Sequence, residues 1–530
     1  MSNHEPSGEW AGARRSFSSR TPVNDNPDKV DYRRGFVTRH QVTGWRFVMR
    51  RIASGIALHD TRMLVDPLRS QSRAVLTGVL ILITGLVGCF VFSLIRPNGQ
   101  AGNNAVLADR STAALYVRVG DELHPVLNLT SARLIVGQPV NPTTVKSTEL
   151  DRFPRGNLIG IPGAPERMVP NASHDANWTV CDAVTGTARG AHSTGVTVIA
   201  GPPESRGARA GELGPSDGVL VDNGTSTWLL WGGKRSQVDL ADHAVTGALG
   251  LGPADVPTPR PIAAGLFNAI PESPALTAPA IANAGSPAGF AVPAPIGAVV
   301  TSYALDKKAS DTVQYYAVLP DGLQPVSPVL AAILRNTNSY GLQQPPRLGA
   351  DEVAKLPVSR LLDTTRYPAQ PVSLVDVARA PVTCAYWSKP AGAAASSLGL
   401  LSGSALPIPD GLRTVELVGG GARVALVPGT GYFTQSVGGG TAAPATGSLF
   451  WVSDTGVRYG IDTESADSAG HTKTVEALGL SSPPLAIPWS MLSLFAAGPT
   501  LSRADALLAH DSLPPDTMPG RVASAEGGTR

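Results

Sequence analysis

The stretch Ala74–Ile95, AVLTGVLILITGLVGCFVFSLI, decides the architecture of this 530-residue chain. It contains neither a charged residue nor a proline. As a helix rising about 1.5 Å per residue it would be about 33 Å long, which is enough to cross the hydrocarbon layer of a membrane. A helix in the core of a soluble protein rarely stays apolar on every face for six turns. The sequence therefore predicts one transmembrane helix at 74–95.

Charge is distributed unevenly on the two sides of this span. Residues 1–73 contain 13 Lys and Arg against 7 Asp and Glu, a net charge of +6, whereas residues 74–530 have a net charge of −4. The positive-inside rule then predicts a cytoplasmic N-terminus and an exported region from residue 97 onward. A cleaved signal peptide fits poorly, because its charged head would be 73 residues long. The total charge of +2 excludes a globally basic nucleic-acid-binding protein.

The inner segment divides into a tail and a helix. Residues 1–30 are polar and aperiodic, so we expect a disordered cytoplasmic tail. Within 31–73, apolar residues recur at spacings of three and four, which predicts a basic amphipathic helix. Its apolar stripe could lie on the anionic inner leaflet or in a groove of a partner protein. The residues expected to make this contact are Arg39, Val42, Trp45, Arg46, Met49, Arg50, Ile52 and Ile56.

The exported part repeats one pattern four times: a strand with an aromatic residue, a turn with glycine, a second strand and a helix. Glycine suits such turns because they often need a positive φ. The aromatic anchors are Tyr116, Trp228, Tyr316 and Phe450, and the turn glycines are Gly120, Gly232, Gly322 and Gly456. Three copies continue to an apolar residue followed by proline, at Phe153-Pro154, Ile270-Pro271 and Leu356-Pro357.

The uneven spacing of the anchors indicates that another unit interrupts the array. We therefore expect an α+β fold, with a single transmembrane helix and an elongated exported region of four strand–helix repeats around a split central β-domain. Chance resemblance among short aliphatic strands is the alternative. The expected bounds are 97–169, 223–299, 300–371 and 447–510 for the repeats, 170–222 and 372–446 for the central β-domain, and 511–530 for a disordered tail.

Two of the three cysteines, Cys181 and Cys384, lie in the exported region, and Cys89 lies in the span. Both exported cysteines stand close to a tryptophan in strand-like sequence. Since the exported compartment is oxidising, we expect a disulfide between them, with two buried free thiols as the alternative. By chain entropy, a bond closing such a long loop would contribute up to roughly 4–5 kcal/mol.

No catalytic motif is present. The sequence lacks H-E-x-x-H, G-x-S-x-G and the Rossmann G-x-G-x-x-G. The pair Gly233-Lys234 does not complete a P-loop, because Trp228 stands where the first glycine is required and Arg235 replaces the Ser or Thr. We interpret Trp228 as a core aromatic. We therefore expect no catalytic residue, no cofactor and no metal, and a protein that is not an enzyme.

The run TRHQVTGWRFVMRRIASGI from Thr38, with HDTRMLVDPLRSQSR from His59 and the single span, resembles the EccB family of mycobacterial type VII (ESX) secretion systems. The resemblance covers nearly the whole chain. It implies a structural subunit of an inner-membrane secretion complex, in which a cytoplasmic docking helix is linked to a periplasmic oligomerising arm. EccC, EccD and EccE are the implied partners, with a mycosin-type protease nearby. It favours docking of the inner helix on cytoplasmic parts of EccC and EccD.

Two other functions stay open at this stage. Members of the EccB family are often labelled ATPases, so ATP is the cofactor under that alternative. A cell-wall-binding repeat protein is the second, since tandem exported repeats can bind glycans. That function predicts exposed aromatic residues on the repeats, whereas Tyr116 and Trp228 are expected to be buried in strands.

Overall fold

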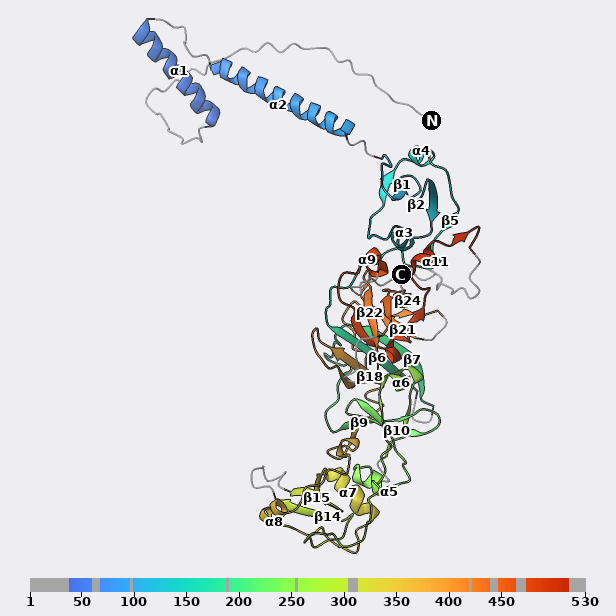
Figure 1. The fold of residues 1–530 in the computed structure, drawn as a ribbon. Helices are drawn as coiled ribbons and strands as arrows, with labels where there is room; N and C mark the ends of the chain where they lie inside the picture. Colours follow the sequence, from blue (N-terminus) through green and yellow to red (C-terminus); the bar gives the residue numbers. More distant parts are fainter. Residues whose placement is uncertain are drawn as a thin grey trace, which may run out of the picture. The chain divides into compact units, whose positions relative to one another are not determined.

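The computed structural model describes residues 38–59, 67–95, 99–186, 190–252, 256–303, 313–418, 422–438, 447–463 and 473–513. The chain forms two compact units, Met1–Pro97 and Asn98–Arg530. The first unit contains two helices, α1 (Arg39–Leu58) and α2 (Pro67–Ile95) (Figure 1). The tail predicted at 1–30 lies outside the described residues, as does all but 511–513 of the tail predicted at 511–530.

Helix α1 begins at a capping box. The Thr38 hydroxyl accepts a hydrogen bond from the backbone N–H of Gln41, and the Gln41 side chain accepts one from the backbone N–H of Thr38. These bonds satisfy two donors that the first turn would otherwise leave unpaired. The helix ends at His59, whose φ of 52° is left-handed. The amphipathic helix thus fills Arg39–Leu58, a shorter range than the predicted segment 31–73.

Helix α2 contains the predicted membrane span. Its stretch Gln71–Phe92 is long and apolar enough to cross a membrane, and none of it is buried within the structure. The helix starts at Pro67, seven residues before the expected start, because a proline is tolerated in the first turn, where its missing N–H costs no hydrogen bond. Among the described residues it is the one helix that meets this criterion, as the predicted fold requires.

The second unit is built from four copies of one β-β-β-α-β-α-β plan around a fifth sheet. Each repeat starts with three antiparallel strands. These are β1 (Val106–Asp109), β2 (Leu115–Val119) and β3 (Glu122–Val126) in repeat 1, β9 (Asp217–Asp222), β10 (Thr227–Trp231) and β11 (Lys234–Gln237) in repeat 2, β14 (Val299–Tyr303), β15 (Val313–Leu319) and β16 (Gly322–Val326) in repeat 3, and β22 (Tyr432–Val437), β23 (Leu449–Val452) and β24 (Val457–Ile461) in repeat 4.

A helix follows each triplet, and the chain then returns in parallel to the first strand. The first helices are α3 (Leu129–Val136), α5 (His243–Ala248), α7 (Pro328–Thr337) and α9 (Lys473–Leu478). The returning strands are β4 (Thr143–Val145) on β1, β12 (Arg260–Pro261) on β9 and β25 (Leu485–Pro488) on β22, and in repeat 3 a single bridge joins Thr301 to Arg347.

A second short helix leads back to the third strand, again in parallel. These helices are α4 (Ser147–Leu150), α6 (Ala264–Ala269), α8 (Ala350–Lys355) and α10 (Trp489–Leu492). The closing pairs are β13 (Glu272–Ser273) on β11 and β26 (Ala496–Ala497) on β24, with the bridges Leu123–Arg155 and Leu323–Val358 in repeats 1 and 3. The apolar-proline steps lie here. The carbonyl oxygens of Pro154, Pro271 and Pro357 accept hydrogen bonds of 2.8, 3.0 and 2.8 Å from the backbones of Leu123, Arg235 and Leu323.

The fifth sheet is the central one, and two distant segments form it. Its strand order is β20-β21-β7-β6-β18-β19-β8. One segment supplies β6 (Ala176–Thr185), β7 (His192–Ala200) and β8 (Gly211–Glu212), and the other supplies β18 (Val382–Lys389), β19 (Ser397–Gly403), β20 (Val415–Glu416) and β21 (Arg423–Ala425). Cys181 on β6 and Cys384 on β18 are direct antiparallel partners and form a disulfide, which confirms the predicted bond.

The boundaries between the repeats and the central sheet differ from those expected. Strand β9 pairs with β10 of repeat 2, and β22 pairs with β23 of repeat 4, although both lie inside the segments assigned to the central β-domain. The pattern used to find the repeats covers only the hairpin after each of these strands, although β22 itself begins with Tyr432 and Phe433. Between β22 and β23 the chain also runs through 439–446, so the partner strands look unrelated in the sequence.

The repeats share hydrophobic cores in pairs. Repeat 1 and repeat 4 bury residues such as Val117 and Trp451 in one core, and repeats 2 and 3 share another that contains Leu229 and Leu330. The first helices of each pair pack together, α3 with α9 and α5 with α7. A further core joins repeats 2 and 4 to the central sheet around Trp178.

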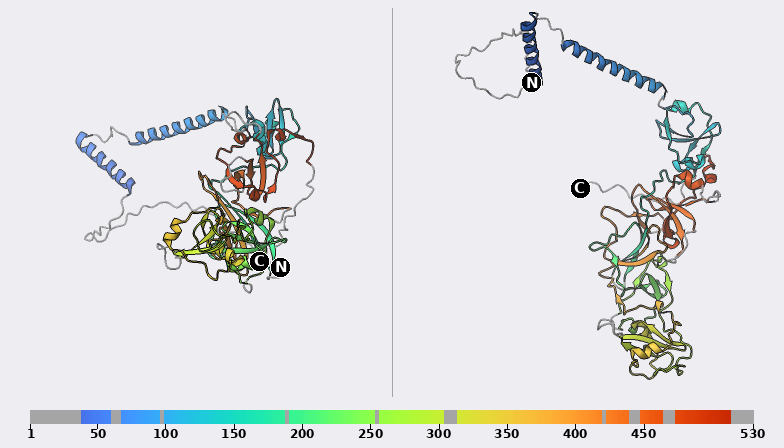
Figure 2. Two further views of the ribbon diagram at one scale, coloured as in Figure 1. Left: turned by 60° about the horizontal axis from the view of Figure 1, so that its bottom comes forward. Right: turned by 60° about the vertical axis from the view of Figure 1, so that its left-hand side comes forward.

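The end of the described chain returns to repeat 1. Helix α11 (Arg503–Ala506) contacts α3, and β27 (Ala509–His510) pairs with β5 (Leu158–Ile159) at the edge of the first sheet. His510 also hydrogen-bonds to the carbonyl oxygen of Gly160 at 2.8 Å. In Figures 1 and 2 the red C-terminal elements accordingly lie beside the cyan strands of repeat 1.

Candidate interaction sites

Among the described residues, His, Cys, Asp and Glu side chains form no group of three that could hold a metal ion. Gly232 and Gly233 form a two-residue hairpin turn between β10 and β11, with φ values of 51° and 75°, and Lys234 is the first residue of β11. This is a tight turn between antiparallel strands, not a loop that leads from a strand into a helix and cradles phosphate.

The Lys234 side chain already has protein partners. Its Nζ donates a hydrogen bond to the carbonyl oxygen of Thr365 at 2.5 Å and lies 4.0 Å from the centre of the Trp231 ring. Burial lowers the pKa of Lys234, and the Asp363 carboxylate opposes that shift. Trp228 is 8% exposed and lies in the core shared with the central sheet, as its interpretation as a core aromatic requires. Lys234 therefore serves repeat packing.

The predicted contact residues of the inner segment all lie on α1, and none of them is buried. The apolar ones stand far out of the helix: Trp45 is 65% exposed and Ile56 is 73% exposed. At 3.6 residues per turn, the five apolar residues of the stripe fall on one face. Phe47, Val48 and Leu58 are exposed as well, so the helix offers more apolar surface than the stripe predicted.

The arginines of α1 are placed asymmetrically around that face. With about 100° between successive residues, Arg39, Arg46 and Arg50 fall along one border of the apolar stripe, and Arg51 falls on the far side. The helix contains no acidic residue. An electropositive border beside an apolar stripe fits a surface that is apolar in its middle and acidic along one edge.

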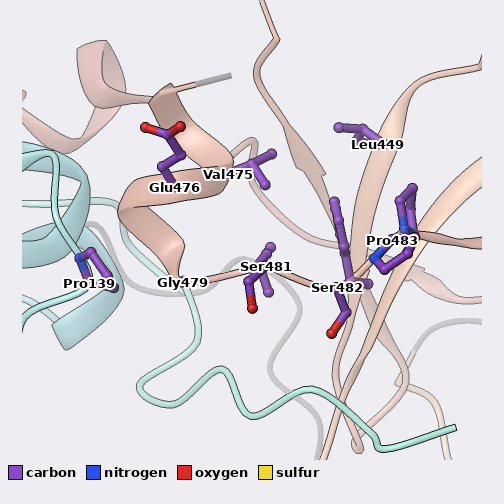
Figure 3. A pocket seen from close by; sticks show the side chains of 11 residues that line it. Pro139, Leu449, Val475, Glu476, Gly479, Ser481, Ser482 and Pro483 are labelled. Atoms are coloured by element: carbon purple, nitrogen blue, oxygen red, sulfur yellow. The ribbon is translucent and has the colours of Figure 1, made fainter. Parts of the chain in front are cut away.

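A second apolar surface lies where repeat 1 meets repeat 4. This cavity has a volume of about 930 Å³. Figure 3 shows Pro139, from the segment after α3, across from Val475 and Glu476 on α9, with Leu449 and Pro483 at the opposite end. Sequence reasoning missed it, because Pro139 lies far along the chain from the other lining residues, which run from Phe433 to Pro484, and no local motif marks them.

Among the described aromatic residues of the repeats, Tyr303 on β14 and Trp489 are exposed, Tyr303 by 41%. Trp489, at the start of α10, is 50% exposed. Its ring centre lies 6.0 Å from that of Phe450, and the Arg458 guanidinium lies 5.2 Å from it. The anchor positions themselves are better covered, since Tyr116, Tyr316 and Phe450 are only partly exposed and Trp228 is buried.

Comparison with known proteins yields one consistent group. The family described as "Type VII secretion system ESX-1, transport TM domain B" matches residues 34–515. The protein named "ESX-3 secretion system ATPase EccB3" from Mycobacterium tuberculosis (strain ATCC 25618 / H37Rv) is 76% identical over 539 residues and is covered completely, as is this chain.

Two solved structures resemble the fold closely. "Structure of EccB3 dimer from the ESX-3 core complex" matches with a TM-score of 0.67 and 60% identity, covering 77% of this chain and 100% of the other. "Structure of an intact ESX-5 inner membrane complex, Composite C3 model" contains a chain with a TM-score of 0.70 and 37% identity, covering 93% of this chain and 99% of the other. Both structures are named as assemblies.

Proposed function

The chain belongs to the EccB family of type VII secretion proteins, and we propose that it is a structural subunit of an ESX complex in the inner membrane. Helix α2 anchors it, α1 docks on partner subunits in the cytoplasm, and the exported unit associates with further copies of itself. One observation carries the proposal: a basic, amphipathic helix with no buried residue precedes a single membrane span. The relatives named as a dimer and as an inner-membrane complex support it.

The occupant of the α1 surface is a protein groove rather than the membrane surface. A helix lying on an anionic leaflet gains from arginines on both borders of its apolar face, because their guanidinium groups reach the phosphates on either side. In α1 three arginines lie on one border. Trp45 projects from the stripe, and buried tryptophans are among the side chains whose truncation costs an interface most. Cytoplasmic parts of EccC and EccD are the partners we propose, with EccE and a mycosin-type protease in the same assembly.

One experiment distinguishes docking of α1 in a protein groove from binding of α1 to the membrane surface. Trp45→Ala and Arg50→Glu would be compared with a helix whose 39–58 sequence is rearranged to keep its charge and amphipathic character. Docking predicts that Trp45→Ala weakens assembly by about 2 kcal/mol or more, and that the rearranged helix fails as well. The measurement is co-purification of tagged protein with other membrane components in mild detergent. If the rearranged helix assembles and supports secretion like the native one, docking is wrong.

The ESX-3 system is the assembly to which we assign the chain. Identity is 76% and 60% to the two proteins named for ESX-3, against 37% to the one named for ESX-5. Replacement of the ESX-3 member by this chain in M. tuberculosis tests the assignment. It should restore ESX-3-dependent secretion and leave an ESX-5 defect unchanged.

The exposed Trp489 favours a second function, binding of cell-wall glycan. An aromatic ring that is 50% exposed and accompanied by Arg458 can stack on a sugar. Pull-down of the protein with purified wall material tests this function, with Trp489→Ala as the variant that should lose binding. Equal binding by the native protein and the Trp489→Ala variant would exclude glycan binding through Trp489.

A further inference from the structure

A small cavity lies where the connection between repeat 1 and the central sheet crosses repeat 4. Its volume is about 180 Å³. Residues 167–169 form one wall, and the loop 429–431 with the β23–β24 turn forms the others. A single water molecule needs only about 10–15 Å³ of such space, so the cavity has room for a group of several atoms.

One wall of this cavity contains a buried donor without a partner. Trp451 on β23 is 1% exposed, and its indole N–H makes no hydrogen bond among the described residues. The indole N–H groups of two other core tryptophans are satisfied: that of Trp178 donates to the carbonyl oxygen of Ala486 at 2.9 Å, and that of Trp231 to the Ser236 hydroxyl at 3.2 Å. Native proteins rarely leave a buried donor unpaired, so this N–H calls for an acceptor.

The contacts of Gly431 place that donor at the cavity. A Cβ atom on Gly431 would lie 2.6 Å from Cε2 of Trp451, the atom to which Nε1 is bonded, and 2.2 Å from Cζ2. A side chain at position 431 would collide with this edge of the indole, so the close approach requires glycine. The backbone of Gly431 is already used, because its N–H donates to Val169 at 2.8 Å and its carbonyl oxygen accepts from Asn171 at 2.7 Å.

Two charged side chains complete the walls. Arg167 is exposed and makes no ion pair or hydrogen bond with any residue that the structure describes. Asp454 accepts a hydrogen bond from the backbone N–H of Gly429 at 2.7 Å through Oδ2, and it too has no described cationic partner. A ligand that fits must therefore present an anionic acceptor to Trp451 and Arg167, and a donor to Asp454.

We propose that this cavity binds the carboxyl-terminal group of a peptide. The free carboxylate accepts hydrogen bonds from the indole N–H of Trp451 and from the Arg167 guanidinium, since charge-assisted bonds of this kind are the stronger ones. The amide N–H one carbon away donates to Asp454, which offsets repulsion between the two carboxylates. The site is independent of α1 and goes beyond the structural role proposed above.

The test uses the full-length protein in detergent, labelled with 5-fluorotryptophan and observed by fluorine NMR. The chain has eight tryptophans, and Trp451→Phe identifies the Trp451 signal by its loss. The probe is N-acetyl-L-alanine, which carries both the carboxylate and the amide. Two controls each lack one feature: N-acetyl-L-alanine amide lacks the carboxylate, and propionate lacks the amide. The D enantiomer distinguishes the end of a wall peptide from that of a polypeptide.

We expect N-acetyl-L-alanine or its enantiomer to shift the Trp451 signal saturably, with a dissociation constant in the low-millimolar range, as befits so small a ligand. The neutral amide should bind about tenfold more weakly. Arg167→Gln should weaken the binding of N-acetyl-L-alanine by a similar factor. Arg206→Gln, at an arginine that is 90% exposed elsewhere on the unit, should change nothing. If no probe moves the signal at about 50 mM, or if Arg167→Gln binds like the native chain, the cavity holds water only and the proposal is wrong.

Discussion

Arg260 and Asp182 form an ion pair almost entirely removed from solvent, at the junction of repeat 2 with the central sheet. Their side chains are 1% and 0% exposed, and 3.2 Å separates Nη2 of Arg260 from Oδ2 of Asp182. The same guanidinium donates to the Thr383 hydroxyl at 2.6 Å and to the carbonyl oxygen of Pro381 at 3.1 Å. Burial lowers the pKa of Arg260, and the neighbouring carboxylate opposes that shift. One side chain thereby links β12 to both β6 and β18.

Arg260→Met should destabilise the second unit by about 3–5 kcal/mol, because it leaves the Asp182 carboxylate buried without its counter-charge. Urea denaturation of the full-length protein, followed by tryptophan fluorescence, measures the change. Arg379→Met is the matched control, since the Arg379–Asp376 pair lies at the surface and should contribute little. Equal midpoints for the two variants would contradict the role given to Arg260.

The contacts of Lys234 leave its amino group unavailable for a nucleotide phosphate. Because its Nζ is already bound to Thr365 and packed on Trp231, we expect Lys234→Met to leave any ATP hydrolysis by a purified preparation unchanged. Phosphate release by the full-length protein before and after repeated purification measures this. Hydrolysis that survives purification and disappears in Lys234→Met would show that the protein is an ATPase.

The two glycines of the β10–β11 turn differ in what they contact. In the β10–β11 turn both glycines have positive φ, but only Gly233 abuts another strand. A Cβ atom on Gly233 would lie 2.2 Å from the carbonyl oxygen of Leu398 on β19, whereas one on Gly232 would meet nothing within 4 Å. The turn of repeat 2 is therefore also a contact with the central sheet.

The two positions form a matched pair for mutation. Gly232→Ala should cost about 1–2 kcal/mol, the strain of a left-handed alanine. Gly233→Ala has the same strain and must also push the turn away from β19, so we expect a clearly larger loss of folding stability. Denaturation midpoints of the two variants decide this. Similar losses would mean that repeat 2 shifts freely against the central sheet.

At the scale of the whole molecule, the charge asymmetry about α2 predicts its orientation. With Cys89 replaced by alanine, Thr43→Cys on α1 and Thr112→Cys in repeat 1 place one exposed thiol in each unit. A membrane-impermeant maleimide should label Thr112→Cys in intact cells and should reach Thr43→Cys only after lysis. Labelling of Thr43→Cys from outside would reverse the topology.

Features that depend on neighbouring residues could be predicted from the sequence. The uncharged run gave the span, the three-and-four spacing gave α1, and the aromatic-glycine hairpins gave the four repeats, because helix period and turn geometry are properties of short segments. The two cysteines in similar contexts were enough to predict their bond.

The packing partners of each segment could not be predicted in this way and are known only from the folded chain. The hairpin pattern does not include the first strands β9 and β22, so their place in the repeats appears only once their partners are known. The pairing of repeat 1 with repeat 4, the buried Arg260–Asp182 pair and the unpaired indole N–H of Trp451 arise from residues far apart in the chain. Burial and hydrogen-bond satisfaction are properties of the packed surroundings, and a residue's own sequence does not contain them.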